Sequence, residues 1–136
     1  MTEVEIPHHC WYEDEPLKLN FPEEWDVHLC KIASEKAVTL DDSEIGYAIN
    51  NPIGTKPLGS MAENAEEAVI IFDDMTRPTK TFQYASHILE TLHKSGMPRE
   101  SIRFIIAPGT HGTYGRRDFV KKLGDEIVSE YPVYNH

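Results

Sequence analysis

The chain has 136 residues, an apolar fraction of 40% and a formal net charge of −10. This length suits one modest domain, and the acidic balance argues against a nucleic-acid partner, whose phosphates require clustered Lys and Arg. Two cysteines do not amount to a disulfide framework. No stretch approaches the ~18–20 apolar residues that span a bilayer, and the acidic start lacks the pattern of a signal peptide, so we predict a cytoplasmic protein without a membrane partner.

The first thirty residues differ from the rest, and we treat residues 1–30 as an N-terminal extension of an α/β domain over residues 31–136. Residues 11–22 alternate apolar and polar side chains around Glu15-Pro16, which predicts a short β-hairpin or an edge segment. His8-His9-Cys10 contains metal-ligand types, but no second ligand pair follows at a usual spacing, so an exposed terminus is the preferred interpretation.

A helix is predicted after residue 41. Asp41 and Glu44 have the spacing of a capping box, and apolar residues then recur at helical spacing, at Ile45, Ala48 and Ile49. Pro52 is expected to stop this helix, and a turn-rich loop over residues 51–59 should follow.

Strands and helices alternate in the second half of the chain. Residues 68–72 and 102–107 are continuous apolar runs, which are typical of strands buried on both faces. An amphipathic helix follows each run, and the predicted inward positions are Phe82, Ala85, Ile88, Leu89 and Leu92 in the first helix and Phe119, Val120 and Leu123 in the second. Gly96 and Gly124 are the expected helix ends, and residues 127–134 predict a third strand. With right-handed crossovers this βαβαβ order predicts a three-layer α/β sandwich with a mainly parallel, Rossmann-like sheet.

Polar loops follow the first two strands, at the sheet edge where open α/β sheets bind ligands. In the first loop, Arg77 suits a bidentate grip on a carboxylate or phosphate, and Asp74 leaves the strand beside it. A helix cap at Asp74 or Thr76 and a surface ion pair at Arg77 would explain the same residues equally well. Asp73 is expected to be structural, because only one of two neighbouring aspartates can face the cleft.

The second loop carries a histidine between glycines. Gly109 lets the backbone approach a ligand closely, and His111 can exchange protons near neutral pH. The alternative is that His111 only forms a hydrogen bond to the backbone. The position of His111 after a strand end favours the functional interpretation. His87 and His93 lie on the polar or boundary side of their helix and are expected to be solvated. The sequence contains no G-x-G-x-x-G, Walker, C-x-x-C or G-x-S-x-G motif.

Taken together, several segments resemble the nickel-dependent lactate racemase family. They are Asp74-Met75-Thr76-Arg77-Pro78 (D-x-T-R-P), Gly109-Thr110-His111 (G-T-H), Leu123-Gly124-Asp125-Glu126 (L-G-x-E), the terminal Asn135-His136 (N-H-D) and the segment from Ala48 to Leu58 (A-x-x-x-P-I-G-x-x-x-L). The likeness runs from about Trp11 to the end. Each motif is common alone, but their order and spacing are fairly specific.

The resemblance implies the amino-terminal domain of an enzyme that racemises or epimerises 2-hydroxy acids by hydride transfer to a nickel pincer nucleotide, a pyridinium mononucleotide. His111 would be one of two catalytic acid–base histidines. Arg77 would hold the substrate carboxylate, with Asp74 lining the same site. Thr76, Gly109 and Thr110 would face the cofactor.

The resemblance also implies that the site is incomplete. The family's cofactor-bearing lysine, nickel-binding histidine and second catalytic histidine lie further along the chain, so no metal ligand is assigned here. We therefore expect no bound cofactor and no activity without a missing C-terminal domain. Gly112 stands where the family commonly has Arg, with Arg116 and Arg117 a few residues on, so lactate is not assumed as the substrate. A small anion- or nucleotide-binding α/β module without catalysis, and a dehydrogenase-like nucleotide domain, are the alternatives.

Overall fold

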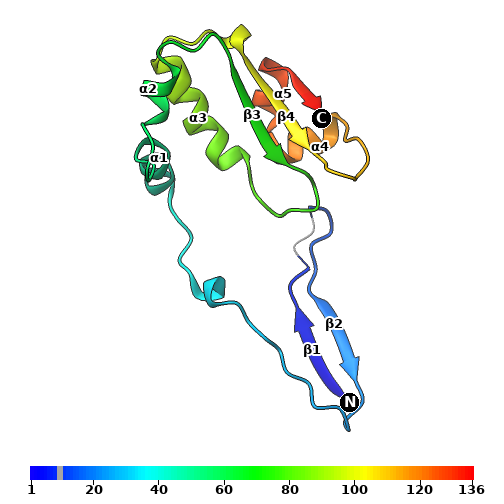
Figure 1. The fold of residues 1–136 in the computed structure, drawn as a ribbon. Coiled ribbons are helices and arrows are strands. Elements are labelled where there is room, and N and C mark those ends of the chain that lie inside the picture. Colours follow the sequence, from blue (N-terminus) through cyan, green and yellow to red (C-terminus); the bar gives the residue numbers. More distant parts are fainter. Residues whose placement is uncertain (9–10) are drawn as a thin grey trace. The chain divides into compact units, whose positions relative to one another are not determined.

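A computed structural model of the protein describes residues 1–8 and 11–136 (Figure 1). Packing divides the chain into two compact units, Met1–Thr39 and Leu40–His136, which are described separately below. The domain boundary expected after residue 30 stays a prediction. His9 and Cys10, two of the three residues in the metal-like tract, lie outside the described residues.

The first unit contains an antiparallel hairpin of β1 (Thr2–Ile6) and β2 (Leu17–Phe21), followed by the short 3-10 helix η1 (Ala33–Lys36). A hairpin was predicted, but only its second strand comes from residues 11–22. The first strand is the start of the chain, where Val4 pairs with Leu19. Residues 3–6 alternate polar and apolar side chains, as residues 17–21 do, and this matched alternation lets the two segments pair.

Two short helices begin the second unit. α1 (Asp42–Asn50) has the predicted capping box, since the backbone N of Glu44 donates to Asp41 at 2.9 Å and the backbone N of Asp41 donates to the Glu44 carboxylate at 2.8 Å. α2 (Leu58–Ala62) was not predicted and lies partly in the expected loop. It starts directly after Pro57, whose fixed φ is compatible with the entry to a helix.

The centre of the second unit is a parallel sheet in the order β3-β4-β5. Its strands are β3 (Ala68–Asp73), β4 (Ile102–Ala107) and β5 (Val133–Asn135), and the 3-10 helix η2 (Arg99–Ser101) leads into β4. The predicted α/β class and parallel sheet are confirmed. The third strand is shorter than predicted, because residues 125–130 form α5 (Asp125–Glu130). Two acidic residues at the start of α5 favour a helix N-terminus there.

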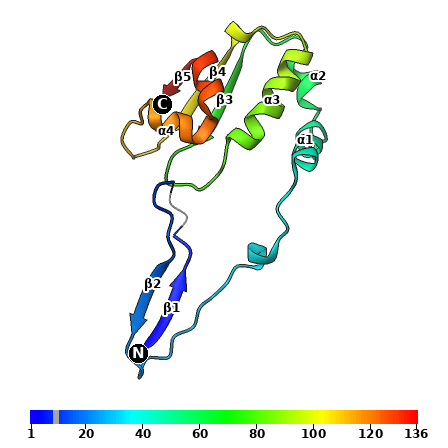
Figure 2. The ribbon, with the colours of Figure 1, turned by 180° about the vertical axis from the view of Figure 1, so that it is seen from behind.

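Three helices pack on one face of the sheet, namely α3 (Phe82–Lys94), α4 (Arg116–Leu123) and α5, as the view from behind shows (Figure 2). α3 and α4 end near Gly96 and at Gly124, as predicted. The core joins the inward faces of the strands and helices, and its fully buried members include Ala85, Ile102, Phe104, Ile106 and Leu123.

The opposite face of the sheet is open. Val69 and Ile71 on β3 are 41% and 70% exposed, so the prediction that this strand is buried on both faces is wrong. Strand order explains the difference: both crossovers move in the same direction along the sheet, and right-handed crossovers then place their helices on the same face. Among the described residues of this unit, no helix therefore covers the second face of the sheet, where the expected sandwich would have its third layer.

No helix in the described part of the chain combines the length and the apolar character that crossing a bilayer requires.

Candidate functional site

The ends of β3 and β4 bring the two predicted loops together. Asp73, the last residue of β3, is in register with Ala107, the last residue of β4. Because these parallel strands end side by side, the loops that follow them leave from one edge of the sheet. Asp74 and His111 meet at this edge.

Asp74 is 4% exposed and receives hydrogen bonds on both carboxylate oxygens. The backbone N and the hydroxyl of Thr76 donate to Oδ1 at 3.0 and 2.6 Å. Oδ2 contacts Nδ1 of His111 and accepts a hydrogen bond from the Tyr114 hydroxyl at 3.2 Å. The aspartate therefore ties its own loop to the loop that carries His111.

The surroundings of Asp74 stabilise its charged form. Burial alone would raise the pKa of this carboxyl, but the hydrogen bonds from Thr76, His111 and Tyr114 outweigh burial and hold the pKa well below its ordinary value. Burial, reinforced by the hydrogen bond to Asp74, raises the pKa of Tyr114. At neutral pH the site thus contains a carboxylate and a protonated phenol.

His111 presents one nitrogen to the protein and about half of its side chain, 51%, to solvent. An ionised carboxylate can only accept hydrogen bonds, so Nδ1 carries the proton that faces Asp74. In the neutral ring this leaves a lone pair on Nε2. The arrangement is that of a base held in one tautomer by an acidic partner, as in enzymes that transfer protons.

Arg77 lies on the same loop as Asp74 and is exposed. Its backbone N donates to the carbonyl of Asp74 at 3.2 Å, which closes a tight turn after β3. The turn is also fixed from α4: Nζ of Lys122 donates to the Arg77 carbonyl at 2.9 Å and to the Thr79 carbonyl at 3.2 Å. Arg77 is therefore an exposed residue on a turn whose backbone is held by hydrogen bonds.

The sequence analysis did not predict a structural role for Lys122. It is fully buried and forms an ion pair with Asp73, with Nζ 2.6 Å from Oδ1. A signal was present, because Lys122 lies three residues after Phe119 and so falls on the predicted inward face of its helix. Asp73 accordingly contacts Lys122 while Asp74 contacts His111.

The glycine-rich part of the second loop is open. Gly109 has a φ of +60°, a conformation that favours glycine, and no atom lies within 4 Å of the position that a Cβ would take. Thr110 is exposed beside it, and Thr76 is exposed on the neighbouring loop. Thr76 is joined to Asp74 through its hydroxyl, and Gly109 and Thr110 directly precede His111, so these exposed residues adjoin the contact between Asp74 and His111.

Two further residues of the site were not singled out individually in the sequence. Tyr114 reaches Asp74 through its hydroxyl, and Asn135 holds the backbone of Tyr114 through two hydrogen bonds, from Tyr114 N at 2.8 Å and to Tyr114 O at 3.0 Å. Asn135 belonged to a recognised motif, but nothing in the local sequence indicated that it contacts Tyr114.

Two other histidines of the second unit, His87 and His93, have their own partners. His87 contacts Asp42 at 2.9 Å and its side chain is largely buried, so the expectation that it is solvated is wrong. His93 contacts the Tyr131 hydroxyl at 2.7 Å. Among the described residues, no three His, Cys, Asp or Glu side chains gather in a way that could hold a metal ion.

Comparison with known proteins agrees with the motifs. The family described as lactate racemase N-terminal domain matches residues 12–136. The chain is 28% identical, over 94% of its length, to a lactate racemase of Thermoanaerobacterium thermosaccharolyticum, and 32% identical, over 78% of its length, to a lactate racemase of Lactiplantibacillus plantarum. It spans only 29% and 26% of the lengths of these relatives. The chain belongs to the lactate racemase N-terminal domain family.

Proposed function

We propose that this chain supplies the proton-transferring and carboxylate-binding part of a 2-hydroxy acid racemase or epimerase. The observation that carries the proposal is the contact between the buried Asp74 and the half-exposed His111, on a loop rim that also contains the exposed residue Arg77. A 2-hydroxy acid offers three groups to such a rim: a carboxylate, a hydroxyl and the hydrogen on the carbon between them.

In this proposal His111 handles the hydroxyl proton. Nε2, with its lone pair, removes the proton as the substrate is oxidised and returns it when the hydroxyl is restored. The imidazolium that forms is stabilised by Asp74, which stays ionised because its pKa lies below the ordinary range. The half-exposed position of His111 gives a small substrate access to Nε2.

Arg77 binds the substrate carboxylate. A guanidinium is always charged at physiological pH and presents a planar pair of donors that matches a carboxylate. The hydrogen bonds from Lys122 fix the backbone of Arg77, so the cation starts from a defined position relative to Asp74. Binding the carboxylate in this way orients the hydroxyl group toward His111.

The pincer nucleotide, when bound, supplies the acceptor for the hydrogen on the substrate carbon. The residues present fit part of such a site. Gly109 and Thr110 offer an open backbone and a hydroxyl, and Thr76 still has acceptor capacity while its hydroxyl donates to Asp74. In this proposal nickel is held by a further domain.

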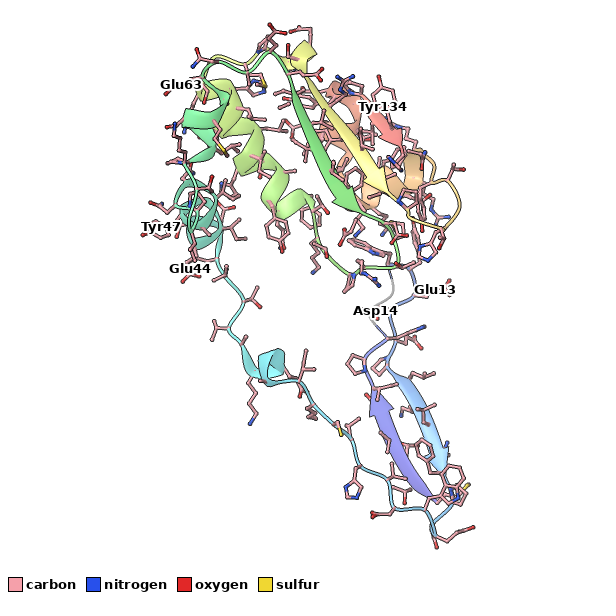
Figure 3. All side chains as sticks on the ribbon, viewed as in Figure 1. Glu13, Asp14, Glu44, Tyr47, Glu63 and Tyr134 are labelled. Atoms are coloured by element: carbon pink, nitrogen blue, oxygen red, sulfur yellow. The ribbon has the colours of Figure 1, made fainter. Side chains whose placement is uncertain are left out.

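The proposal includes a further domain, which would complete the active site. The chain spans less than a third of each relative, and the open face of the sheet exposes Val69, Ile71 and Tyr134, which parallel sheets normally cover. Figure 3 shows the side chain of Tyr134 on β5. We therefore expect the 136-residue chain alone to be inactive and to bind no pincer nucleotide stably.

The test is turnover by the full-length protein, loaded with cofactor and nickel and assayed by chiral chromatography against a panel of 2-hydroxy acids. His111→Ala should lower kcat roughly 10²- to 10⁴-fold, the usual contribution of a general acid–base. His28→Ala, which changes a histidine exposed in the first unit, is the matched control and should keep wild-type activity. Near wild-type turnover by His111→Ala would remove His111 from the mechanism.

Arg77→Ala should act mainly on substrate capture. Loss of charge-assisted hydrogen bonds to a carboxylate should raise KM by roughly 10- to 100-fold, with a smaller change in kcat. Arg77→Lys should recover only part of the affinity, because an ammonium cannot bind a carboxylate in the same bidentate way. An unchanged KM in Arg77→Ala would show that another cation holds the substrate.

A further inference from the structure

Tyr114 connects the histidine loop to both neighbouring strand ends. We propose that Tyr114 is a positioning residue that keeps the Asp74 carboxylate aligned on His111, and that Asn135 holds Tyr114 in place for this purpose. The structural part of this inference stands on contacts alone, and its consequence for turnover rests on the proposed function.

The contacts on Asp74 define how its carboxylate is oriented. Two donors of Thr76 hold Oδ1, at 2.6 and 3.0 Å, and the Tyr114 hydroxyl holds Oδ2 at 3.2 Å. His111 contacts this same Oδ2. With only the Thr76 contacts, the carboxyl group could swing about the bond to its β-carbon. The Tyr114 hydroxyl restrains the oxygen that His111 uses.

Asn135 restrains Tyr114 through its backbone. The side-chain amide of Asn135 accepts from Tyr114 N at 2.8 Å and donates to Tyr114 O at 3.0 Å, so both backbone polar groups of one residue are held by one side chain. Asn135 itself ends β5, and the next residue continues the sheet, since His136 N donates to Ile106 O at 3.1 Å. The position of Tyr114 is thus set by the sheet.

Such an anchor is needed because the loop between Pro108 and Tyr114 is poorly supported. Residues 109–113 are all exposed, and two of the five are glycine. Buried Pro108 fixes the start of the loop, where His111 N donates to Pro108 O at 3.0 Å. Tyr114 fixes the other end. A histidine on an exposed glycine-rich segment is held in one place only if both ends are held.

The phenol is suited to this task at physiological pH. Burial, together with the neighbouring Asp74, raises the pKa of Tyr114, so its hydroxyl is a donor at neutral pH, where the carboxylate is ionised. Asp118 adds to this effect electrostatically. Tyr114→Phe removes the donor alone and keeps the ring, which makes it a clean test of the hydroxyl.

The first experiment uses the 136-residue chain and requires no activity. In ¹⁵N-labelled protein, the histidine ring spectrum should show His111 in a single tautomer with a proton on Nδ1. In Tyr114→Phe that proton should exchange with water about tenfold faster, as expected when one hydrogen bond to a charged group is lost. Tyr47→Phe, at an exposed tyrosine of α1 (Figure 3), is the matched control and should leave the His111 signals unchanged. Identical His111 exchange in wild type and Tyr114→Phe would overturn the proposal.

The second experiment measures turnover of the full-length, cofactor-loaded protein. Tyr114→Phe should lower kcat about tenfold and change KM less than about twofold, because Arg77 and the substrate carboxylate are unaffected. If Tyr114→Phe does not fold, Asn135→Asp takes its place, since it keeps the acceptor for Tyr114 N and loses the donor to Tyr114 O; it should give the same pattern. An unchanged kcat in a folded variant would contradict the positioning role.

The two experiments separate the possible failures. If the full-length protein turns over no 2-hydroxy acid but the His111 proton responds to Tyr114→Phe, the proposed function fails and the positioning contact stands. If the protein is active and the His111 proton does not respond, the positioning role fails and the proposed function stands.

Discussion

Lys122 of α4 and Asp73 of β3 form an ion pair in which Nζ lies 2.6 Å from Oδ1, and the lysine is fully buried. Asp73 and its neighbour Asp74, which follows β3, thus have different partners. Asp73 reaches the helix beneath the sheet edge, and Asp74 reaches His111. The ion pair therefore fixes the backbone from which the candidate site is built.

Replacing Lys122 should destabilise the fold. Lys122→Met leaves Asp73 and the carbonyls of Arg77 and Thr79 without their donor, and we expect a loss of about 2–4 kcal/mol in the free energy of unfolding, less than for a fully enclosed pair because Asp73 is partly exposed. Urea unfolding followed by circular dichroism measures it. Lys121→Met, at the exposed neighbouring lysine, should change stability by less than about 0.5 kcal/mol. Equal stability of the two variants would contradict the structural role of Lys122.

Asp74 should make the fold sensitive to acid. Its folded-state pKa lies below the value in the unfolded chain, so the unfolded chain binds the proton first and acid favours unfolding. The stabilisation is fully present above the ordinary aspartate pKa of about 4 and is lost as the pH falls below it. Urea midpoints measured from pH 6 to pH 3 should fall more steeply for wild type than for Asp74→Asn. Parallel curves would show that Asp74 does not gain its stabilisation as a carboxylate.

The backbone conformation of Gly109 predicts how a substitution in this loop changes the stability of the fold. Gly109→Ala should cost about 1–2 kcal/mol, since its φ of +60° is strained for any residue with a Cβ and no neighbouring atom interferes. Gly112→Ala is the matched control in the same loop, with equal open space and a φ outside the positive region, and should cost less than about 0.5 kcal/mol. Thermal unfolding distinguishes the two. Equal melting temperatures would show that Gly109 does not adopt this conformation in solution.

The features that depend on local spacing were predictable from the sequence. The capping box of Asp41 and Glu44, the helix end at Gly124 and the apolar runs of β3 and β4 are set by neighbouring residues, and the structure confirms them. Residues 127–130 belong to the segment 127–134 that the sequence predicts as a strand, but they lie in α5. Tertiary packing favours a helix here, because Ile127 and Tyr131 are four residues apart, which is a helical spacing, and both are buried in the core.

Long-range relations were only partly accessible. That Asp74 and His111 leave neighbouring strand ends followed from the alternation of strands and helices, and the structure brings them into contact. The contact between Tyr114 and Asn135 joins residues 21 positions apart through side-chain geometry that no local pattern encodes. The exposure of Ile71 depended on strand order, which a sequence pattern does not determine.

The most direct test of the central claim is the turnover of Asp74→Asn in the full-length, cofactor-loaded protein, measured as inversion of a 2-hydroxy acid by chiral chromatography. The substitution preserves size and leaves Arg77 and His111 in place, but it removes the charge that faces Nδ1 of His111. The account predicts that kcat falls at least about 100-fold while KM changes little. A kcat within about twofold of wild type, or a loss confined to KM, would contradict the claim that Asp74 and His111 work as an acid–base pair.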